Sequence, residues 1–266
     1  MLKSFKIVGI FWIAHLASYL YSQSQNGYHY HYYYHNGHYH YYLHQNQNNN
    51  QSNQTNNHNH DHSHDHNHGQ TPNVNHQHGF ESLAEVFESP ERAKWQKPDK
   101  VIEVLGDLSD KTVADLGAGT GYFTFRLVKV AKKVIALDTS SYFIQYIQNK
   151  RNTLPKPYQD RLITRLISYS DSGLQNQEVD ILLAVDVYHH IENRVEYFQK
   201  IWSLFPEGGK VVIVDFKENS TLPGGPPKQS RLSFKQVVNE LHQSGFKSIQ
   251  ASKSILEHQY IVIAKK

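Results

Sequence analysis

The 266-residue sequence contains no cysteine. Disulfide bridges, thiolate zinc sites and a cysteine nucleophile are therefore excluded, although this absence leaves the redox compartment undecided. The chain also has little excess charge, with 27 basic against 24 acidic residues and a formal net charge of +3. A dedicated nucleic-acid-binding protein concentrates basic residues on one face. We therefore expect no nucleic-acid partner.

The apolar run near the N-terminus is too short for a full membrane span. It covers Ile7–Tyr21, whereas a helix that crosses a bilayer needs about 20 apolar residues. Basic Lys3 and Lys6 precede it, and small Ser22 follows at a position suited to cleavage. Residues 1–22 are therefore predicted to be a secretory signal peptide of an exported protein, either periplasmic or secreted. The alternatives are an uncleaved membrane anchor, with membrane contact through this segment, and a buried amphipathic helix in a cytoplasmic protein.

Residues 23–79 differ in composition from the rest of the chain. Residues 1–79 hold 15 of the 19 histidines, and no apolar periodicity runs through the segment, so we expect 23–79 to be disordered. Alternating histidines at i and i+2 can chelate Zn²⁺, Ni²⁺ or Cu²⁺ in pairs. The candidate ligands lie in one tract: His58, His60, His62, His64, His66 and His68. The alternative is a low-complexity tail whose metal affinity is incidental.

Residues 80–266 alternate strand and helix patterns, which predicts one α/β domain with a parallel sheet. The expected strands are Thr112–Leu116, Lys133–Asp138, Leu162–Ser168, Asp180–Val187 and Lys210–Phe216. The expected helices are Tyr122–Val130, Ser141–Arg151, Arg194–Leu204 and Phe234–Ser244. Two further segments, Ile255–Gln259 and Tyr260–Ala264, indicate a final antiparallel strand pair.

A glycine-rich turn follows the first expected strand of this domain. Gly117, Gly119 and Gly121 separate that strand from the next helix, and Asp138 ends the second strand. Glycine lets the backbone approach a ligand closely, and an acid at the end of the neighbouring strand can accept hydrogen bonds from a ribose diol. A dinucleotide site requires a third glycine where this chain has Tyr122, which disfavours a nicotinamide-dependent oxidoreductase.

The segment DLGAGTG, which begins at Asp115, resembles the first motif of the class I S-adenosylmethionine-dependent methyltransferases. The resemblance extends over residues 80–266 through Asp138, DILLAVDVYHHIENR and GGKVVIVDFKE, and the sequence before the turn looks like a bacterial subgroup of unassigned acceptor. It implies a Rossmann-like fold, with a mostly parallel seven-stranded sheet, helices on both faces and a C-terminal antiparallel strand. It also implies S-adenosylmethionine as the cofactor.

The resemblance also implies roles for individual residues. The three glycines would hold the methionine and ribose portion, Asp115 would support the loop or the cofactor amine, and Asp138 would bind the ribose hydroxyls. Asp171 is the acid available for an adenine contact after the third strand, and Asp186 is a candidate cofactor contact after the fourth.

His189 and His190 follow Asp186 and are the candidate general bases for a hydroxyl or amine acceptor, because a histidine can accept a proton near neutral pH. The alternative is that they cap the following turn. The sequence thus predicts a methyltransferase that acts on a small-molecule acceptor. The alternative function is a histidine-rich metal-binding protein with a catalytically silent methyltransferase scaffold.

Overall fold

The computed structural model describes residues 84, 87–222, 225–226 and 228–266 in full, and residues 28–35 and 38–45 by their backbone. The chain divides into two compact units, Met1–Leu83 and Ala84–Lys266, which we describe separately. The expected signal peptide and the tract from His58 to His68 lie outside the described residues. Among the described residues, no helix has both the length and the apolar character needed to cross a bilayer.

The first unit contains an antiparallel strand pair, β1 (Tyr28–His35) and β2 (His38–Gln45), in which Tyr28 pairs with Gln45 and His35 with His38. This differs from our expectation that residues 23–79 lack regular structure. Tyrosine and histidine alternate with the period of a strand here, and the two strands are separated by the dipeptide Asn-Gly, the pair most favoured in two-residue hairpins. The expectation was based on the absence of apolar periodicity, which does not detect this local signal.

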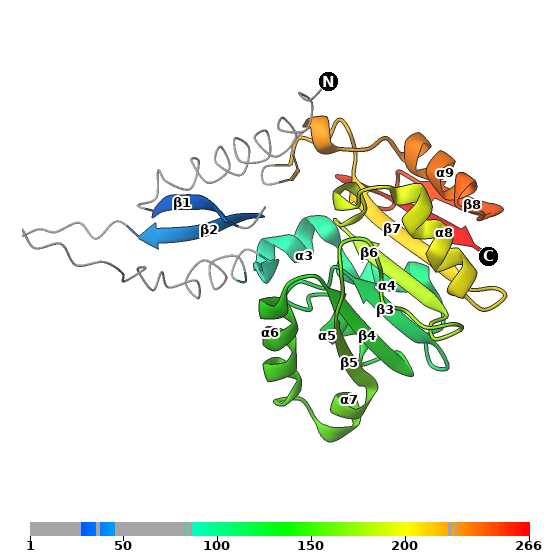
Figure 1. Cartoon of the computed structure of the whole chain (residues 1–266), viewed down its shortest axis with the longest axis horizontal. Helices are drawn as coiled ribbons and strands as arrows, with labels where there is room; N and C mark the ends of the chain where they lie inside the picture. The colour runs from blue at the N-terminus through cyan, green and yellow to red at the C-terminus, as the bar shows by residue number, and fades with distance from the viewer. Residues whose placement is uncertain (1–27, 36–37, 46–83, 85–86, 223–224, 227) are drawn as a thin grey trace, which may run out of the picture. The chain divides into compact units, whose positions relative to one another are not determined.

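The second unit is built on a seven-stranded sheet with the strand order β5-β4-β3-β6-β7-β9-β8 (Figure 1). The strands β3 to β7 run parallel, whereas β9 is antiparallel to both of its neighbours. This confirms the predicted Rossmann-like fold with a C-terminal antiparallel strand. The strands are β3 (Thr112–Leu116), β4 (Lys133–Asp138), β5 (Leu162–Leu166), β6 (Ile181–Val185), β7 (Lys210–Phe216), β8 (Ser248–Ser252) and β9 (Gln259–Lys265).

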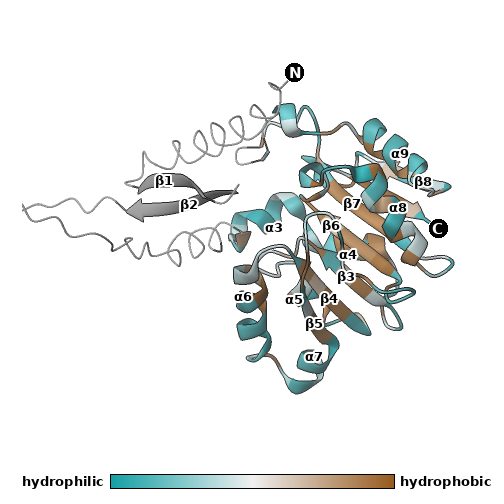
Figure 2. Cartoon of the chain, in the orientation of Figure 1, coloured by the Kyte–Doolittle hydropathy of each residue, from teal (hydrophilic) through white to brown (hydrophobic). Residues whose placement is uncertain are grey.

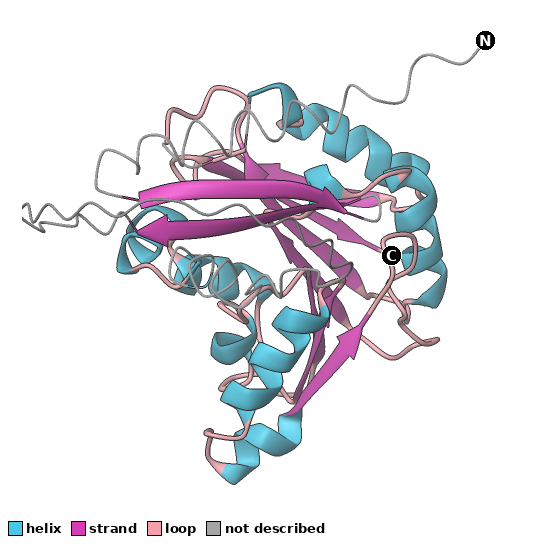
Figure 3. Ribbon diagram, turned by 60° about the vertical axis from the view of Figure 1, so that its left-hand side comes forward, coloured by secondary structure: helices cyan, strands magenta, loops and turns pink. Residues whose placement is uncertain are grey.

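Helices cover both faces of this sheet, as Figure 3 shows. Apolar strand residues alternate between two core clusters: Leu182 and Ala184 pack under α8 and α9, and Leu183 packs under α4, α5 and α6. The central strands are correspondingly apolar along their length (Figure 2). The helices are α3 (Pro90–Gln96), α4 (Pro98–Leu105), α5 (Thr124–Leu127), α6 (Ser141–Arg151), α7 (Lys156–Arg161), α8 (Arg194–Leu204) and α9 (Phe234–Gln243), with 3₁₀ turns η1 (Tyr188–His190) and η2 (Lys228–Ser230).

Two expected elements differ from the structure. The first strand of the final pair is β8 (Ser248–Ser252), not Ile255–Gln259, which forms the connection to β9. The β8 strand lies at the sheet edge and is polar, so it has little apolar signal, whereas Leu256 in the connection is buried in the core. The helix expected at Tyr122–Val130 is reduced to α5 (Thr124–Leu127), because a turn precedes it and another follows it.

Candidate active site

The glycine turn after β3 depends on its three glycines for two different reasons. Gly117, Gly119 and Gly121 all have positive φ, at 68°, 55° and 82°. A Cβ at Gly117 would lie 2.3 Å from the Val187 side chain, and one at Gly121 would lie 2.6 Å from Phe125. These two glycines therefore serve the packing of the protein itself. At Gly119 the nearest atom to a Cβ would be 3.7 Å away, so this glycine borders the space in which a ligand can approach the backbone.

Asp138, at the end of β4, is held by the backbone around the turn. Its Oδ2 accepts the N–H of Gly119 at 2.8 Å, and its Oδ1 accepts the N–H of Ser140 at 2.8 Å. Burial raises the pKa of Asp138, and these N–H groups oppose the rise. The backbone N–H of Thr139 has the same effect on this pKa. A carboxylate has about four acceptor positions, so Asp138 keeps acceptor capacity for a further donor. This arrangement fits a ribose diol.

Asp115 lies beneath the glycine turn. The side chain is 3% exposed, and it accepts a hydrogen bond from Thr124 Oγ1 at 2.6 Å. Burial raises the pKa of this carboxyl to about 6. The contact joins β3 to α5 across the turn, so the geometry favours support of the loop over contact with the cofactor amine.

The N-terminal part of the domain covers the turn, which sequence reasoning missed. The Arg92 guanidinium of α3 lies 4.1 Å from the centroid of the Tyr122 ring and donates to the carbonyl oxygen of Phe87 at 3.0 Å. Glu88 accepts a hydrogen bond from Thr120 Oγ1 at 2.8 Å. Burial lowers the pKa of Arg92, although the carboxylate of Asp186 opposes the effect.

Asp186 follows β6 in a left-handed backbone conformation, with φ of 58°. This conformation is uncommon for a residue other than glycine and is often found at functional sites. Its carboxylate accepts hydrogen bonds from Gln96 Nε2 at 2.9 Å and from Gln259 Nε2 at 2.5 Å. Burial and the neighbouring Asp215 raise the pKa of Asp186 to about 6. Asp186 therefore connects α3, β6 and β9 beside the glycine turn.

The two candidate bases, His189 and His190, have different surroundings in the structure. His189 Nδ1 lies 2.9 Å from both carboxylate oxygens of Asp215, and the two side chains are 2% and 1% exposed. Burial lowers the pKa of His189, but attraction to Asp215 outweighs it and the pKa is raised. His190 follows on the same turn, with its ring centroid 4.1 Å from that of His189, and burial together with the charge of His189 lowers the pKa of His190 to about 3. Asp215 was missed by sequence reasoning, although it is the second-last residue of β7, much as Asp138 is the last residue of β4.

Asp171 lies apart from these contacts. It is exposed in the loop after β5, where its Oδ1 accepts the backbone N–H of Gly173 at 2.7 Å. Its adenine contact stays a prediction. Among the residues whose side chains are described, no group of three histidines or carboxylates is arranged to hold a metal ion.

A methyltransferase-domain family model matches residues 114–213, from β3 into β7. The chain is 26% identical over 175 residues to the tRNA U34 carboxymethyltransferase of Actinobacillus succinogenes, covering 59% of this chain and 50% of that protein. The chain thus spans about half the length of the curated relatives it matches.

Two solved structures show the same fold. One is a methyltransferase from Aquifex aeolicus that depends on S-adenosylmethionine, with a TM-score of 0.61, 21% identity and coverage of 69% of this chain and 96% of that one. The other is the cyclase SpnF, with a TM-score of 0.54, 13% identity and coverage of 64% and 80%. The second case shows that the fold alone does not determine the reaction. Residues 114–213 thus match a methyltransferase domain, and the chain has the fold of the class I methyltransferases.

Asp138→Asn should weaken the binding of S-adenosylmethionine at least about tenfold, since one charge-assisted hydrogen bond contributes roughly 1.5–3 kcal/mol. The new amide group would also oppose the N–H of Gly119 or of Ser140. Calorimetric titration measures the effect. Asp160→Asn is the matched control, because Asp160 is exposed and pairs only with Lys156 on α7 in the described contacts. Equal affinity in both variants would contradict the ribose assignment.

Asp115→Asn should change the pH dependence of stability. Between the ordinary pKa of 3.8 and about 6, folded Asp115 keeps a proton that the unfolded chain releases, so the wild-type free energy of unfolding falls as pH rises through this window. The asparagine side chain does not ionise, so its free energy of unfolding has no such fall with pH. Its amide oxygen still accepts the hydrogen bond from Thr124. The stability of the variant relative to wild type should rise by roughly 2–3 kcal/mol between pH 4 and pH 7.5, measured by denaturant titration. A difference that is constant with pH would refute this account.

Proposed function

We propose that this chain transfers the methyl group of S-adenosylmethionine to a hydroxyl or amino group of a small-molecule acceptor. The observation that carries the proposal is the Asp138 carboxylate, fixed by the N–H groups of Gly119 and Ser140 at the ends of β3 and β4. The position is the one at which parallel α/β sheets bind nucleosides. The methyltransferase-domain match over residues 114–213 supports the same conclusion.

Residues along the edge where the parallel strands end would have different roles. When bound, the cofactor supplies an electrophilic methyl group on a sulfonium. The glycine turn and Asp138 would hold its nucleoside portion, and Asp186 lies between that region and β7. For such a displacement the protein needs chiefly to place the acceptor in line and to accept its proton.

His189 is the better placed of the two candidate bases. Asp215 contacts Nδ1, which orients the ring and leaves Nε2 as the nitrogen that can accept a proton. The same carboxylate raises the pKa of His189, which makes the neutral imidazole a stronger base. On the same turn, burial and the charge of His189 lower the pKa of His190 to about 3, so its imidazole is a much weaker base.

His189→Gln should therefore lower kcat by about 10²–10⁴-fold and leave the Kd of S-adenosylmethionine nearly unchanged, because a base acts in the transition state. In the wild type, kcat should fall as pH falls through the pKa of His189, which lies above the ordinary 6.5. The variant should lose this limb of the profile. His190→Gln is the matched control and should keep both rate and profile. The measurement is transfer of a labelled methyl group to fractionated small molecules, with thermal melts to verify folding. Retained turnover in His189→Gln would exclude it as the base.

A second candidate acceptor is tRNA, because the matched relatives are named tRNA U34 carboxymethyltransferases. The small net charge of +3 does not favour it. The same assay separates the two acceptor classes, since label recovered in added tRNA and not in small molecules would replace the small-molecule proposal.

We further propose that residues 1–22 direct export and that the tract from His58 to His68 binds divalent metal. The support is the sequence alone: a basic start followed by an apolar run, and alternating histidines. Zinc bound by the full chain should be released as pH falls through about 6.5, because imidazolium cannot ligate. Replacing the six histidines by asparagine should abolish this step, and cell fractionation tests export. Zinc binding without any affinity for S-adenosylmethionine would favour the silent-scaffold alternative.

A further inference from the structure

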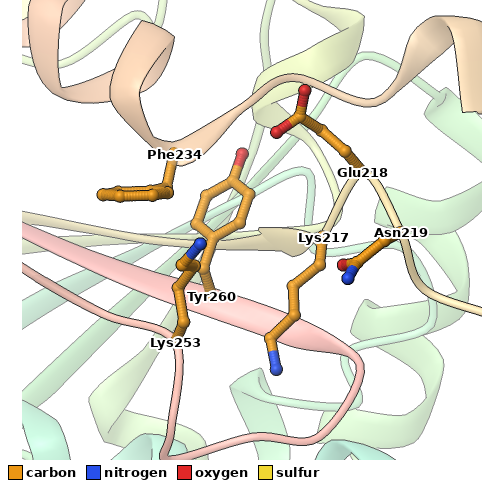
Figure 4. A pocket seen from close by; sticks show the side chains of 6 residues that line it. All are labelled: Lys217, Glu218, Asn219, Phe234, Lys253 and Tyr260. Carbon is orange, nitrogen blue, oxygen red and sulfur yellow. The ribbon is translucent and has the colours of Figure 1, made fainter.

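A cavity of about 230 Å³, shown in Figure 4, borders β9, which pairs with the strand β7 that carries Asp215. Its wall on the sheet side is Tyr260 of β9, which pairs with Asp215 in the register between β7 and β9. At about 30 Å³ per water in the liquid, the cavity has room for one small organic molecule. It is lined by Lys217, Glu218, Asn219, Phe234, Lys253 and Tyr260.

Within the part of the chain that the structure describes, the hydroxyl group of Tyr260 has no hydrogen-bond partner, although the residue is only 1% exposed. Burial raises the pKa of Tyr260 well above its ordinary value, and the nearby carboxylate of Asp215 adds to the rise. The hydroxyl therefore stays protonated and can donate. In Figure 4 it points into the space between Phe234 and Glu218. A buried polar group without a partner is unfavourable, so a ligand that reaches this buried oxygen from the cavity and accepts its hydrogen bond would gain affinity.

The charges around the cavity are unevenly placed. The Lys253 ammonium lies 4.4 Å from the ring centroid of Phe234. Lys217 Nζ donates to the carbonyl oxygen of Leu256 at 2.8 Å, and burial, with the charge of Lys253, lowers the pKa of Lys217. An anion near both ammonium groups would relieve their repulsion. Glu218 lies toward the hydroxyl end of Tyr260, away from the Lys217 ammonium (Figure 4).

We propose that this cavity binds a small aromatic acid bearing a hydroxyl or amino group, and that it is the acceptor subsite of the methyltransferase. The acidic group lies against Lys253, the ring lies on Phe234, and the hydroxyl or amino group faces Tyr260 and Glu218. One ligand of this kind would contact the ring of Phe234, the ammonium of Lys253 and the hydroxyl of Tyr260. The assignment as acceptor subsite rests on the proposed function.

Calorimetry on the full chain with 4-hydroxybenzoate as the probe tests this proposal. We expect binding at micromolar to millimolar concentration, and about tenfold weaker binding of phenol, which lacks the acidic group. S-adenosylhomocysteine is titrated separately. If S-adenosylhomocysteine binds but 4-hydroxybenzoate does not, this inference is overturned and the proposed function stands. If 4-hydroxybenzoate binds but neither S-adenosylhomocysteine nor S-adenosylmethionine does, the proposed function fails, and with it the acceptor assignment.

Tyr260→Phe removes only the hydroxyl without a partner. It should weaken binding of 4-hydroxybenzoate about fivefold, while the melting temperature stays constant or rises, since no hydrogen bond among the described residues is lost. Tyr188→Phe is the matched control, because the Tyr188 hydroxyl donates to Glu240 Oε2 at 2.9 Å. That variant should lower the melting temperature and keep the affinity.

Lys253→Gln should weaken binding about tenfold, as expected for one charge-assisted contact. Lys247→Gln, at an exposed lysine outside the cavity lining, should leave the affinity unchanged. Wild-type affinity in both Tyr260→Phe and Lys253→Gln would overturn the proposal.

Discussion

The hydrogen bond from the Gly119 N–H to the Asp138 carboxylate is the contact on which the candidate site depends. It ties the end of β4 to the turn that follows β3, in which Gly119 has a positive φ. Gly117 and Gly121 hold the same turn against Val187 and Phe125 from the other side. The loop is therefore fixed before any ligand arrives, which reduces the entropy that binding must remove.

Four carboxylates lie at or just beyond the ends of neighbouring parallel strands, and each is distinguished by its partner. Asp115 accepts from a threonine hydroxyl, Asp138 from backbone N–H groups, Asp186 from two glutamine amides, and Asp215 lies against an imidazole. Burial raises the pKa of the first three. A buried carboxylate is unfavourable unless its lone pairs are used, so these partners determine what each acid can still do. Asp138 keeps lone pairs for a ligand, whereas Asp115 and Asp186 are engaged in joining elements.

The sheet and the glycine turn could be predicted because their signals are local. Strands β3, β4 and β7 begin and end where the alternation of apolar segments and turns indicates, and the glycines between β3 and α5 stand in seven consecutive residues. The contacts of Asp186 with Gln96 and Gln259 could not be predicted, since the partners are 90 and 73 residues away along the chain. The local sequence around a polar residue such as Gln96, in a short helix, does not indicate which strand that residue will contact.

The antiparallel strand β9 contributes residues both to the cofactor region and to the cavity, although it is distant in sequence from the glycine turn. Sequence reasoning treated it as the completion of the sheet. Consecutive residues of a strand point to opposite faces: Gln259 donates to Asp186 beside the cofactor region, and Tyr260 turns its hydroxyl toward the cavity. Because β9 pairs with β7 along its whole length, Asp215 is opposite Tyr260 and also contacts His189. One register therefore fixes the spacing between the cofactor region, the candidate base and the cavity, and a shift of β9 by one residue would place Gln259 and Tyr260 on the wrong faces.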